Sequence, residues 1–162
     1  MLTASAAGLL LLICLKSINC LLPSGEKLEN EYLPDLTPSC LGCICEATTN
    51  CNLTIGCLGQ HCGPFFISRA YWKEAGSPVL YGDTPTRVEA YETCVNDPYC
   101  AATTLTRYMF RFAQDCNENG VLECDDYARI HYLGGEQCHL PVHRFGYYGV
   151  FRNCHVAVQL LN

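Results

Sequence analysis

The chain has 162 residues, among them 14 cysteines, and 16 acidic side chains against 10 Lys and Arg give it a formal net charge of −6. This balance excludes the extended basic surface on which nucleic-acid binding depends, and it provides no positive field that draws a protein to anionic bacterial surfaces. The length supports one domain with a modest core that disulfides supplement.

Residues 1–20 are predicted to be a signal peptide. The apolar run from Ala6 to Leu15 is too short to span a bilayer and lies at the extreme N-terminus. The usual basic start is missing, because Lys16 follows the run. We expect cleavage near Cys20, no membrane span, and a secreted, extracellular protein.

Cysteine usage supports this location. Loss of Cys14 and Cys20 with the signal leaves twelve cysteines, and an even number in a secreted chain is typical of a disulfide framework, here of six bonds. The alternative is a zinc site that uses the Cys40-x2-Cys43 spacing, which suits a reducing compartment.

Residues 21–39 are rich in proline and acid and lack cysteine, so they are predicted to form a flexible N-terminal arm. Residues 40–162 are predicted to form one domain. Its first part, residues 40–62, holds six cysteines and scattered glycines, and we expect at most one helical turn and short extended pieces there. Asn52-Leu53-Thr54 is an N-glycosylation sequon.

Helices are predicted for the second half of the chain. Thr86-x-x-Glu89 is a capping-box pattern after Pro85, and it predicts a helix that begins at Thr86 and ends at Asn96-Asp97-Pro98. Apolar side chains at helical spacing predict the next helix, from about Tyr99 to Ala113. They are Leu105, Tyr108, Met109 and Phe112.

Two further helices are expected. One runs from about Asp125 to Leu133 and stops at Gly134-Gly135, and the last lies between Val142 and Cys154. Several aromatic residues could line a groove, although such residues are more often part of a core. They are Tyr71, Trp72, Phe145, Tyr147 and Tyr148.

The twelve residues from Asp115 to Asp126 have the pattern of a calcium loop between two predicted helices, with oxygen donors at positions 1, 3 and 5 and glycine at position 6. The predicted ligands are the side chains of Asp115, Asn117, Asn119 and Asp126 and the carbonyl of Val121. The alternative is a polar loop without metal, in which Asp125 and Asp126 cap the next helix. Apart from this structural calcium, no cofactor is required.

The spacing and order of many short motifs resemble those of the invertebrate-type (i-type) lysozymes, a family that includes the leech destabilases. The motifs lie between residues 40 and 154 and are C-x2-C-x-C-x5-C, Cys62-Gly63-Pro64-Phe65, Tyr71-Trp72, Asn96-Asp97-Pro98-Tyr99-Cys100-Ala101, Arg107-Tyr108-Met109, Cys124-Asp125-Asp126-Tyr127-Ala128-Arg129-Ile130-His131, Gly134-Gly135 and Cys138. The resemblance implies an α+β, mainly helical, lysozyme-like fold with a small extended subdomain and a sugar-binding cleft. The family reaction is hydrolysis of the β-1,4 bond between N-acetylmuramic acid and N-acetylglucosamine in bacterial peptidoglycan.

The resemblance also implies how the twelve cysteines pair. The six pairs are Cys40–Cys124, Cys43–Cys154, Cys45–Cys51, Cys57–Cys62, Cys94–Cys100 and Cys116–Cys138.

The catalytic carboxyls of the family are replaced here. The family's acid, a Glu three residues after the third cysteine of the cluster, corresponds to Thr48, and its Asp, three residues after the fifth, corresponds to Gln60. Glycoside hydrolysis needs two carboxyls, so we expect weak activity or none. Glu46 is a weak substitute that we interpret as a surface residue, and Glu74 and Asp83 could line a cleft.

Three functions follow from these residues. The first is a lysozyme that acts on peptidoglycan in defence or digestion, and the second is a non-catalytic glycan-binding or regulatory protein on the same fold. The third is the isopeptidase activity of destabilases, which has been linked to a Ser at the position of His61. Ser68 and His131 remain as weak evidence for a nucleophile and base.

Overall fold

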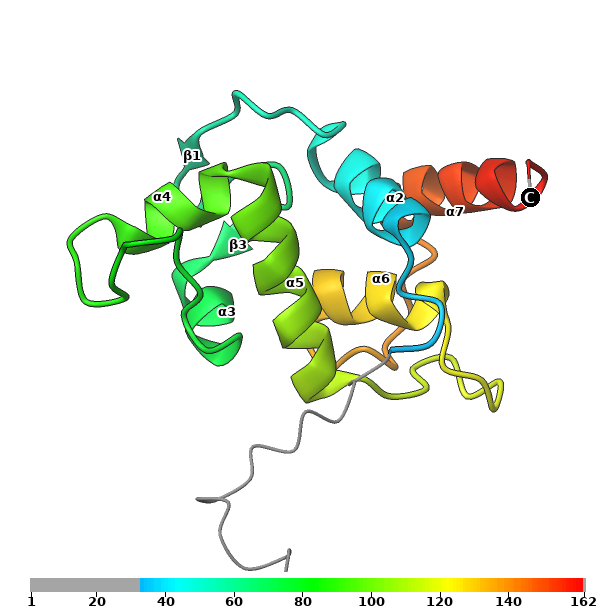
Figure 1. The fold of residues 1–162 in the computed structure, drawn as a ribbon. Coiled ribbons are helices and arrows are strands. Elements are labelled where there is room, and N and C mark those ends of the chain that lie inside the picture. The colour runs from blue at the N-terminus through cyan, green and yellow to red at the C-terminus, as the bar shows by residue number, and fades with distance from the viewer. Residues whose placement is uncertain (1–32, 162) are drawn as a thin grey trace, which may run out of the picture. The chain divides into compact units, whose positions relative to one another are not determined.

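The computed structural model describes residues 33–161, so the predicted signal peptide and residues 21–32 of the predicted arm lie outside the described part. The described part is α+β and mainly helical, as predicted (Figure 1). Its elements are α2 (Pro38–Thr49), β1 (Cys57–Leu58), β2 (His61–Cys62), β3 (Ile67–Ser68), α3 (Arg69–Glu74), α4 (Ala90–Asn96), α5 (Pro98–Phe112), α6 (Cys124–Leu133) and α7 (Gly146–Gln159).

Helix α2 occupies the first half of the cysteine cluster, where the sequence led us to expect no more than one helical turn; that prediction was wrong. Thr37 caps the helix by accepting a hydrogen bond from the Cys40 N–H at 3.1 Å, and Pro38 occupies the first turn. Cys40, Cys43 and Ile44 are buried, and their spacing is that of one helical face. The cysteines themselves therefore form the apolar stripe of this helix.

The segment just before α2 is held against the domain. Leu33 and Leu36 pack on the core, the Asp35 carboxylate accepts a hydrogen bond from the Cys124 N–H at 3.0 Å, and the Tyr127 hydroxyl donates to the carbonyl of Pro34 at 2.8 Å. Residues 33–39 are thus part of the domain and not of a flexible arm. The arm remains a prediction for residues 21–32.

Helix α5 is the central element of the core, and it lies where the sequence predicts it. Asp97 caps its N-terminus by accepting from two backbone N–H groups, and Pro98 begins the first turn. Leu105 and Met109 have no exposed surface, and Tyr108 is buried beside them. Helix α6 also agrees with its predicted range.

Helix α4 begins later than the capping-box pattern predicts. The pattern places the start at Thr86, whereas the first helical residue is Ala90. Arg87 instead forms two hydrogen bonds to the Asp83 carboxylate, both at 2.6 Å, and Glu89 adopts a left-handed conformation with φ of +67°. These side-chain bonds hold residues 83–89 as a loop, so the helix starts only after it.

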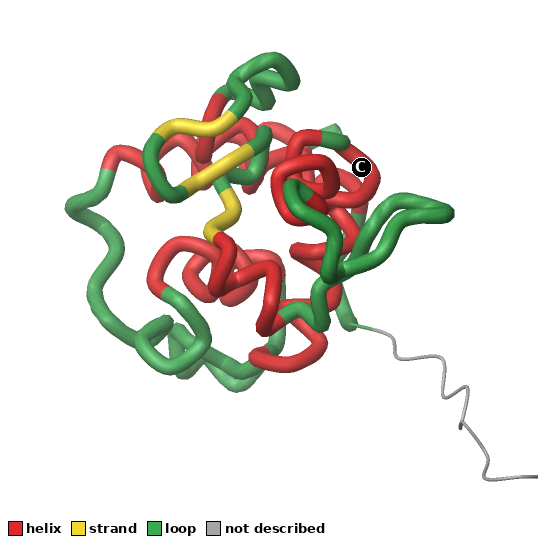
Figure 2. Tube along the Cα trace, turned by 90° about the vertical axis from the view of Figure 1, so that its left-hand side faces the viewer, coloured by secondary structure: helices red, strands yellow, loops and turns green. Residues whose placement is uncertain are grey.

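The three short strands form one antiparallel sheet in the order β1-β2-β3 (Figure 2).

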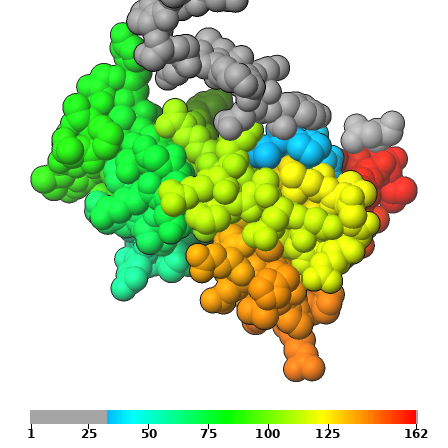
Figure 3. All heavy atoms as spheres, turned by 90° about the horizontal axis from the view of Figure 1, so that it is seen from below, coloured from blue at the N-terminus to red at the C-terminus, as the bar shows by residue number. Residues whose placement is uncertain are grey.

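Helices α2 and α7 lie side by side (Figure 1), and α7 extends past the range expected for the last helix. Figure 3 shows the orange connection from α6 to α7 at the surface. None of the helices within residues 33–161 is both long and apolar enough to cross a bilayer.

Six disulfides cross-link the domain, and they join the same cysteines that the resemblance pairs. They are Cys40–Cys124, Cys43–Cys154, Cys45–Cys51, Cys57–Cys62, Cys94–Cys100 and Cys116–Cys138. The alternative was a zinc site at Cys40 and Cys43. Both cysteines are disulfide-bonded, so they do not bind zinc.

Candidate functional site

A surface hollow of about 240 Å³ surrounds Thr48, and we call it the Thr48 hollow. It is formed by the end of α2, the strand β2, the turn between β2 and β3, and residues of α6 and α7. Its lining is largely aromatic and consists of Ala47, Thr48, His61, Phe65, Phe66, His131, Tyr132 and Tyr147. The predicted groove residue Tyr147 is therefore part of this site.

The side chain of Thr48 is held by its own helix. Its hydroxyl donates a hydrogen bond of 2.6 Å to the carbonyl of Ile44, one turn earlier in α2. None of the residues that line the Thr48 hollow is Asp or Glu. The hollow therefore lacks a carboxylic acid that could protonate a leaving oxygen.

Gln60 lies in a separate, larger hollow of about 610 Å³, which we call the Gln60 hollow. Arg69, Tyr91 and Glu92 are among its other lining residues, and Arg69 forms an ion pair with Glu92 at 2.5 Å. His61 lines both hollows. The two family positions thus flank His61, and the structure places them in adjoining hollows instead of one.

Stacked aromatic rings form the walls of the Thr48 hollow. The His61 and Phe66 rings are parallel within 13° and 4.9 Å apart, and the Tyr132 and Tyr147 rings are parallel within 11° and 4.6 Å apart. Aromatic faces of this kind offer apolar contact area at fixed orientation. Phe66 and Tyr132 carry no signal in the sequence that marks them as site residues, because the fold alone brings the β2–β3 turn next to α6.

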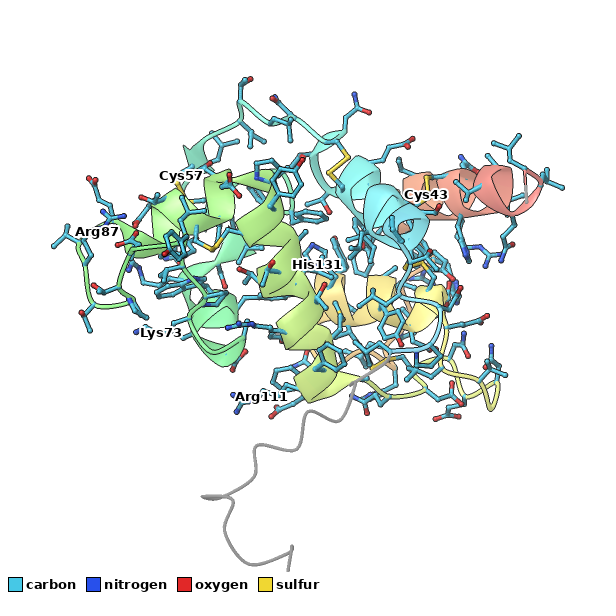
Figure 4. All side chains as sticks on the ribbon, viewed as in Figure 1. Cys43, Cys57, Lys73, Arg87, Arg111 and His131 are labelled. Atoms are coloured by element: carbon cyan, nitrogen blue, oxygen red, sulfur yellow. A yellow bond between two sulfur atoms is a disulfide. The ribbon has the colours of Figure 1, made fainter. Side chains whose placement is uncertain are left out.

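His131 lies at the inner side of this hollow, among the helices (Figure 4). Burial lowers the pKa of His131 to about 4, so its imidazole is neutral near pH 7. Its Nδ1 lies 3.3 Å from the hydroxyl of Tyr71, whose own pKa burial raises well above its usual value.

Ser68, the other half of the predicted dyad, is the N-cap of α3. Its hydroxyl oxygen accepts a hydrogen bond from the Tyr71 N–H at 3.1 Å. Ser68 and His131 both line a third hollow, of about 260 Å³, but the polar partners of the His131 ring are the Tyr71 hydroxyl and the backbone of Phe65. The arrangement therefore gives Ser68 a structural role.

The remaining acidic residues differ in their positions. Glu74, one of the two acids that could line a cleft, lines the third hollow. Asp83 is paired with Arg87 on the loop before α4, and this pairing lowers the pKa of Asp83. Glu46 is exposed and lines none of these three hollows, as expected for a surface residue.

The predicted calcium loop lies between α5 and α6, but its side-chain oxygens accept hydrogen bonds from the backbone. Both oxygens of Asp126 accept N–H groups, from Cys116 at 2.8 Å and Glu123 at 2.9 Å. Within residues 33–161, no three His, Cys, Asp or Glu side chains are grouped to hold a metal ion. The other predicted side-chain ligands, Asp115, Asn117 and Asn119, also accept backbone N–H groups, and Val121 donates one of them.

The residues of this loop form the helix-capping alternative in part. Glu123 and Asp126 form a capping box at the start of α6. Asp125 has a different role from the predicted cap, because it is buried and pairs with Arg129 at 2.8 Å and with the hydroxyl of Tyr148 at 2.6 Å.

Asn52, the predicted glycosylation position, lies in an exposed turn after α2. Its Oδ1 accepts hydrogen bonds from the N–H and the hydroxyl of Thr54.

Comparison with known proteins identifies the family. The family model described as Destabilase matches residues 37–154. A protein named Lysozyme from Magallana gigas is 32% identical over 112 residues, which cover 65% of this chain and 72% of that protein. Invertebrate-type lysozyme 3 of Caenorhabditis elegans is 31% identical over 121 residues, which cover 71% of this chain and 84% of that protein.

Solved structures agree with these relatives. The crystal structure of an inhibitor-bound lysozyme from Meretrix lusoria matches with a TM-score of 0.57 and 28% identity, covering 74% of this chain and 93% of that one. The lysozyme of Tapes japonica matches with a TM-score of 0.56 and 27% identity, covering 75% of this chain and 93% of that one. The chain belongs to the destabilase family of invertebrate-type lysozymes.

Proposed function

We propose that the protein is a secreted, lysozyme-like protein that binds the glycan strands of bacterial peptidoglycan in the Thr48 hollow and hydrolyses them weakly or not at all. Family membership supports the choice of ligand. The weak or absent hydrolysis is supported by Thr48. Its hydroxyl donates a hydrogen bond to the carbonyl of Ile44, and no carboxyl lines the hollow around it.

The expected loss of activity follows from the chemistry of glycoside hydrolysis. The reaction needs one protonated and one ionised carboxyl beside the scissile bond. Each general acid–base step contributes roughly 10²–10⁴-fold to the rate. Neither Thr48 nor Gln60 can take these roles, and the stacked rings are left to bind sugar without cleaving it.

The stacked rings support binding because a sugar ring presents an apolar face that packs on an aromatic face. His61, Phe66, Tyr132 and Tyr147 provide two such pairs in one hollow. Isopeptidase activity is not part of the proposal, since Ser68 caps α3 and His61 occupies the position of the expected nucleophile.

The proposal is tested by sedimentation with insoluble peptidoglycan and by the clearing of a peptidoglycan suspension. We expect the wild-type protein to sediment with the polymer and not to clear it. Tyr132→Ala, which removes one ring of the hollow, should reduce sedimentation, whereas Leu161→Ala, in the exposed turn after α7, should not. Rapid clearing by the wild type, or no sedimentation, would overturn the proposal.

A gain-of-function variant tests the assignment of the two catalytic positions. Thr48→Glu with Gln60→Asp restores both carboxyls, and we expect clearing to rise at least tenfold above the wild type. The matched control is Ala157→Glu with Gln159→Asp, which adds the same charges at two exposed positions of α7. Equal clearing by both double variants would show that the positions are misassigned.

A further inference from the structure

A fourth hollow of the molecule lies apart from the Thr48 hollow and shares none of its lining residues. It has a volume of about 520 Å³ and lies between the loop that follows α3 and the first half of α5. Tyr81, Tyr99 and Arg107 are among its lining residues, so we call it the Tyr81 hollow. It shares no lining residue with the Thr48 hollow or the Gln60 hollow.

Two tyrosine rings at this hollow face solvent. Tyr81 is fully exposed, and Tyr99 retains 84% of its accessible surface. Large rings with a polar tip are typical of binding surfaces, because they supply apolar contact area at little conformational cost. Two of them beside one hollow form a surface on which flat, partly apolar ligands can stack.

The loop that carries Tyr81 is anchored on both sides. Before Tyr81, the indole N–H of Trp72 donates to the carbonyl of Pro78 at 2.7 Å. After it, Arg87 forms two hydrogen bonds to Asp83, and one of its nitrogens also donates to Thr93 at 3.0 Å. A ligand therefore meets a loop whose backbone is already held in place, which reduces the entropy lost on binding.

The hollow also offers an unpaired cation. Arg107 is exposed, and its guanidinium has no hydrogen bond or ion pair to any residue within 33–161. The carboxylate of Asp97, which also lines the hollow, accepts the backbone N–H groups of Tyr99 and Cys100 through Oδ1. A free guanidinium beside two rings favours a ligand that carries a carboxylate, because it can bind both carboxylate oxygens at once.

We propose that the Tyr81 hollow is a second glycan site, which takes an N-acetylated sugar that carries a carboxylate, of the muramic acid type. The rings of Tyr81 and Tyr99 stack on the sugar, and Arg107 binds its carboxylate. The inference rests on the proposed function for the class of glycan. It adds a site outside the Thr48 hollow for glycan strands on which the muramic acid carboxylate is free and not amide-linked to a stem peptide.

The test is an NMR titration of the labelled wild-type chain with two soluble oligosaccharides of equal length. One alternates N-acetylglucosamine with N-acetylmuramic acid, and the other contains N-acetylglucosamine alone. Ring signals of Tyr81 and Tyr99 report the Tyr81 hollow, and those of Phe66 and Tyr132 report the Thr48 hollow in the same sample. We expect the muramic acid oligosaccharide to shift the Tyr81 and Tyr99 signals and to bind there more tightly than the other.

Substitutions define the contacts. Arg107→Gln should weaken binding at the Tyr81 hollow by about tenfold, as loss of one charge-assisted pair does, while Arg144→Gln, at another exposed arginine, should leave it unchanged. Tyr81→Ala should abolish the shift of the Tyr99 signals and leave the shifts of Phe66 and Tyr132 unchanged.

The wild-type titration separates the two proposals. If Phe66 and Tyr132 respond but Tyr81 and Tyr99 do not, the second site is overturned and the proposed function stands. The reverse pattern overturns the proposed function and keeps the second site, and equal binding of both sugars overturns the role of the carboxylate.

Discussion

Gly63 lies in the turn between β2 and β3 that brings Phe66 into the Thr48 hollow. It has a φ of +74°, and a Cβ atom at this position would lie 1.6 Å from the carbonyl oxygen of Val95. Phe66 in the same turn has a φ of +52°, which is uncommon for a residue other than glycine. The backbone at this turn is therefore fixed by contact with α4, and the ring of Phe66 is fixed with it.

Gly63→Ala is expected to destabilise the fold severely, because the new methyl group overlaps the backbone of α4. The free energy of unfolding should fall by more than about 3 kcal/mol. Gly56→Ala is the matched control, since Gly56 also has a positive φ, +64°, but nothing lies within 4 Å of its added Cβ. It should cost only about 1 kcal/mol. Urea denaturation of both variants measures the difference, and equal losses would contradict the role of the contact with Val95.

His131 makes stability depend on pH. Because burial lowers its pKa from 6.5 to about 4, the unfolded chain binds a proton first as the pH falls. Stability should therefore be full above pH 6.5 and decline between pH 6.5 and 4, by up to about 3 kcal/mol. His131→Gln should flatten this part of the profile, and His143→Gln, at an exposed histidine, should not. Chemical denaturation at a series of pH values measures the slope, and an unchanged slope in His131→Gln would assign the effect to another group.

At the scale of elements, the start of α6 depends on one carboxylate. Asp126 is fully buried and accepts hydrogen bonds from the N–H groups of Cys116, Asn117 and Glu123. Burial raises its pKa, and these bonds offset part of that rise. Asp126 therefore ties the loop to the helix that follows it.

Asp126→Ala should lower the free energy of unfolding by about 3 kcal/mol, because it leaves buried N–H groups without acceptors. Asp115→Ala, which removes acceptors from a more exposed part of the loop, should cost about 1 kcal/mol. Thermal melting with and without millimolar calcium completes the experiment. We expect calcium not to raise the melting temperature of the wild type. If calcium raises it and Asp126→Ala abolishes the rise, the loop binds calcium as the sequence pattern predicts.

The elements that the sequence predicts well have complete local signals. Helix α5 has its cap, its proline and its apolar stripe within one segment, and α6 has its acidic first turn and terminal glycine. Helix α2 was not predicted because its buried face consists mainly of cysteines. Their spacing indicates a disulfide framework but does not distinguish a helix from other backbone conformations. The start of α4 was misplaced because the pairing of Arg87 with Asp83 overrides the capping pattern.

The candidate site could be predicted only in part. The resemblance to the family places the acid at position 48, and its replacement by Thr is visible in the sequence. The rings that surround it come from segments far apart in the chain, such as Phe66 and Tyr132, and no local pattern links them. The free cation of the Tyr81 hollow is likewise invisible before folding, since charge alone does not show which arginines are paired.

At the scale of the whole molecule, the six disulfides divide into long and short links. Cys43–Cys154 joins α2 to α7 across 111 positions of the chain, and Cys40–Cys124 joins α2 to α6 across 84. Cys57–Cys62 spans only five positions within the sheet. Helix α2, which positions Thr48, is thus fastened to two distant parts of the chain.

The long links should dominate the stability of the domain, because closing a long loop removes more entropy from the unfolded chain. With Cys40–Cys124 intact, Cys43–Cys154 closes a loop of about 33 residues, and this model gives about 4 kcal/mol for it and about 2 kcal/mol for Cys57–Cys62. Replacing both cysteines of each pair by alanine and measuring urea denaturation compares the two. If the short pair proves the more important, strain or packing at the sheet outweighs loop closure. Sedimentation of the same variants with peptidoglycan shows whether the link between α2 and α7 also preserves the Thr48 hollow. We expect C43A/C154A to lose peptidoglycan binding at temperatures at which C57A/C62A still binds it.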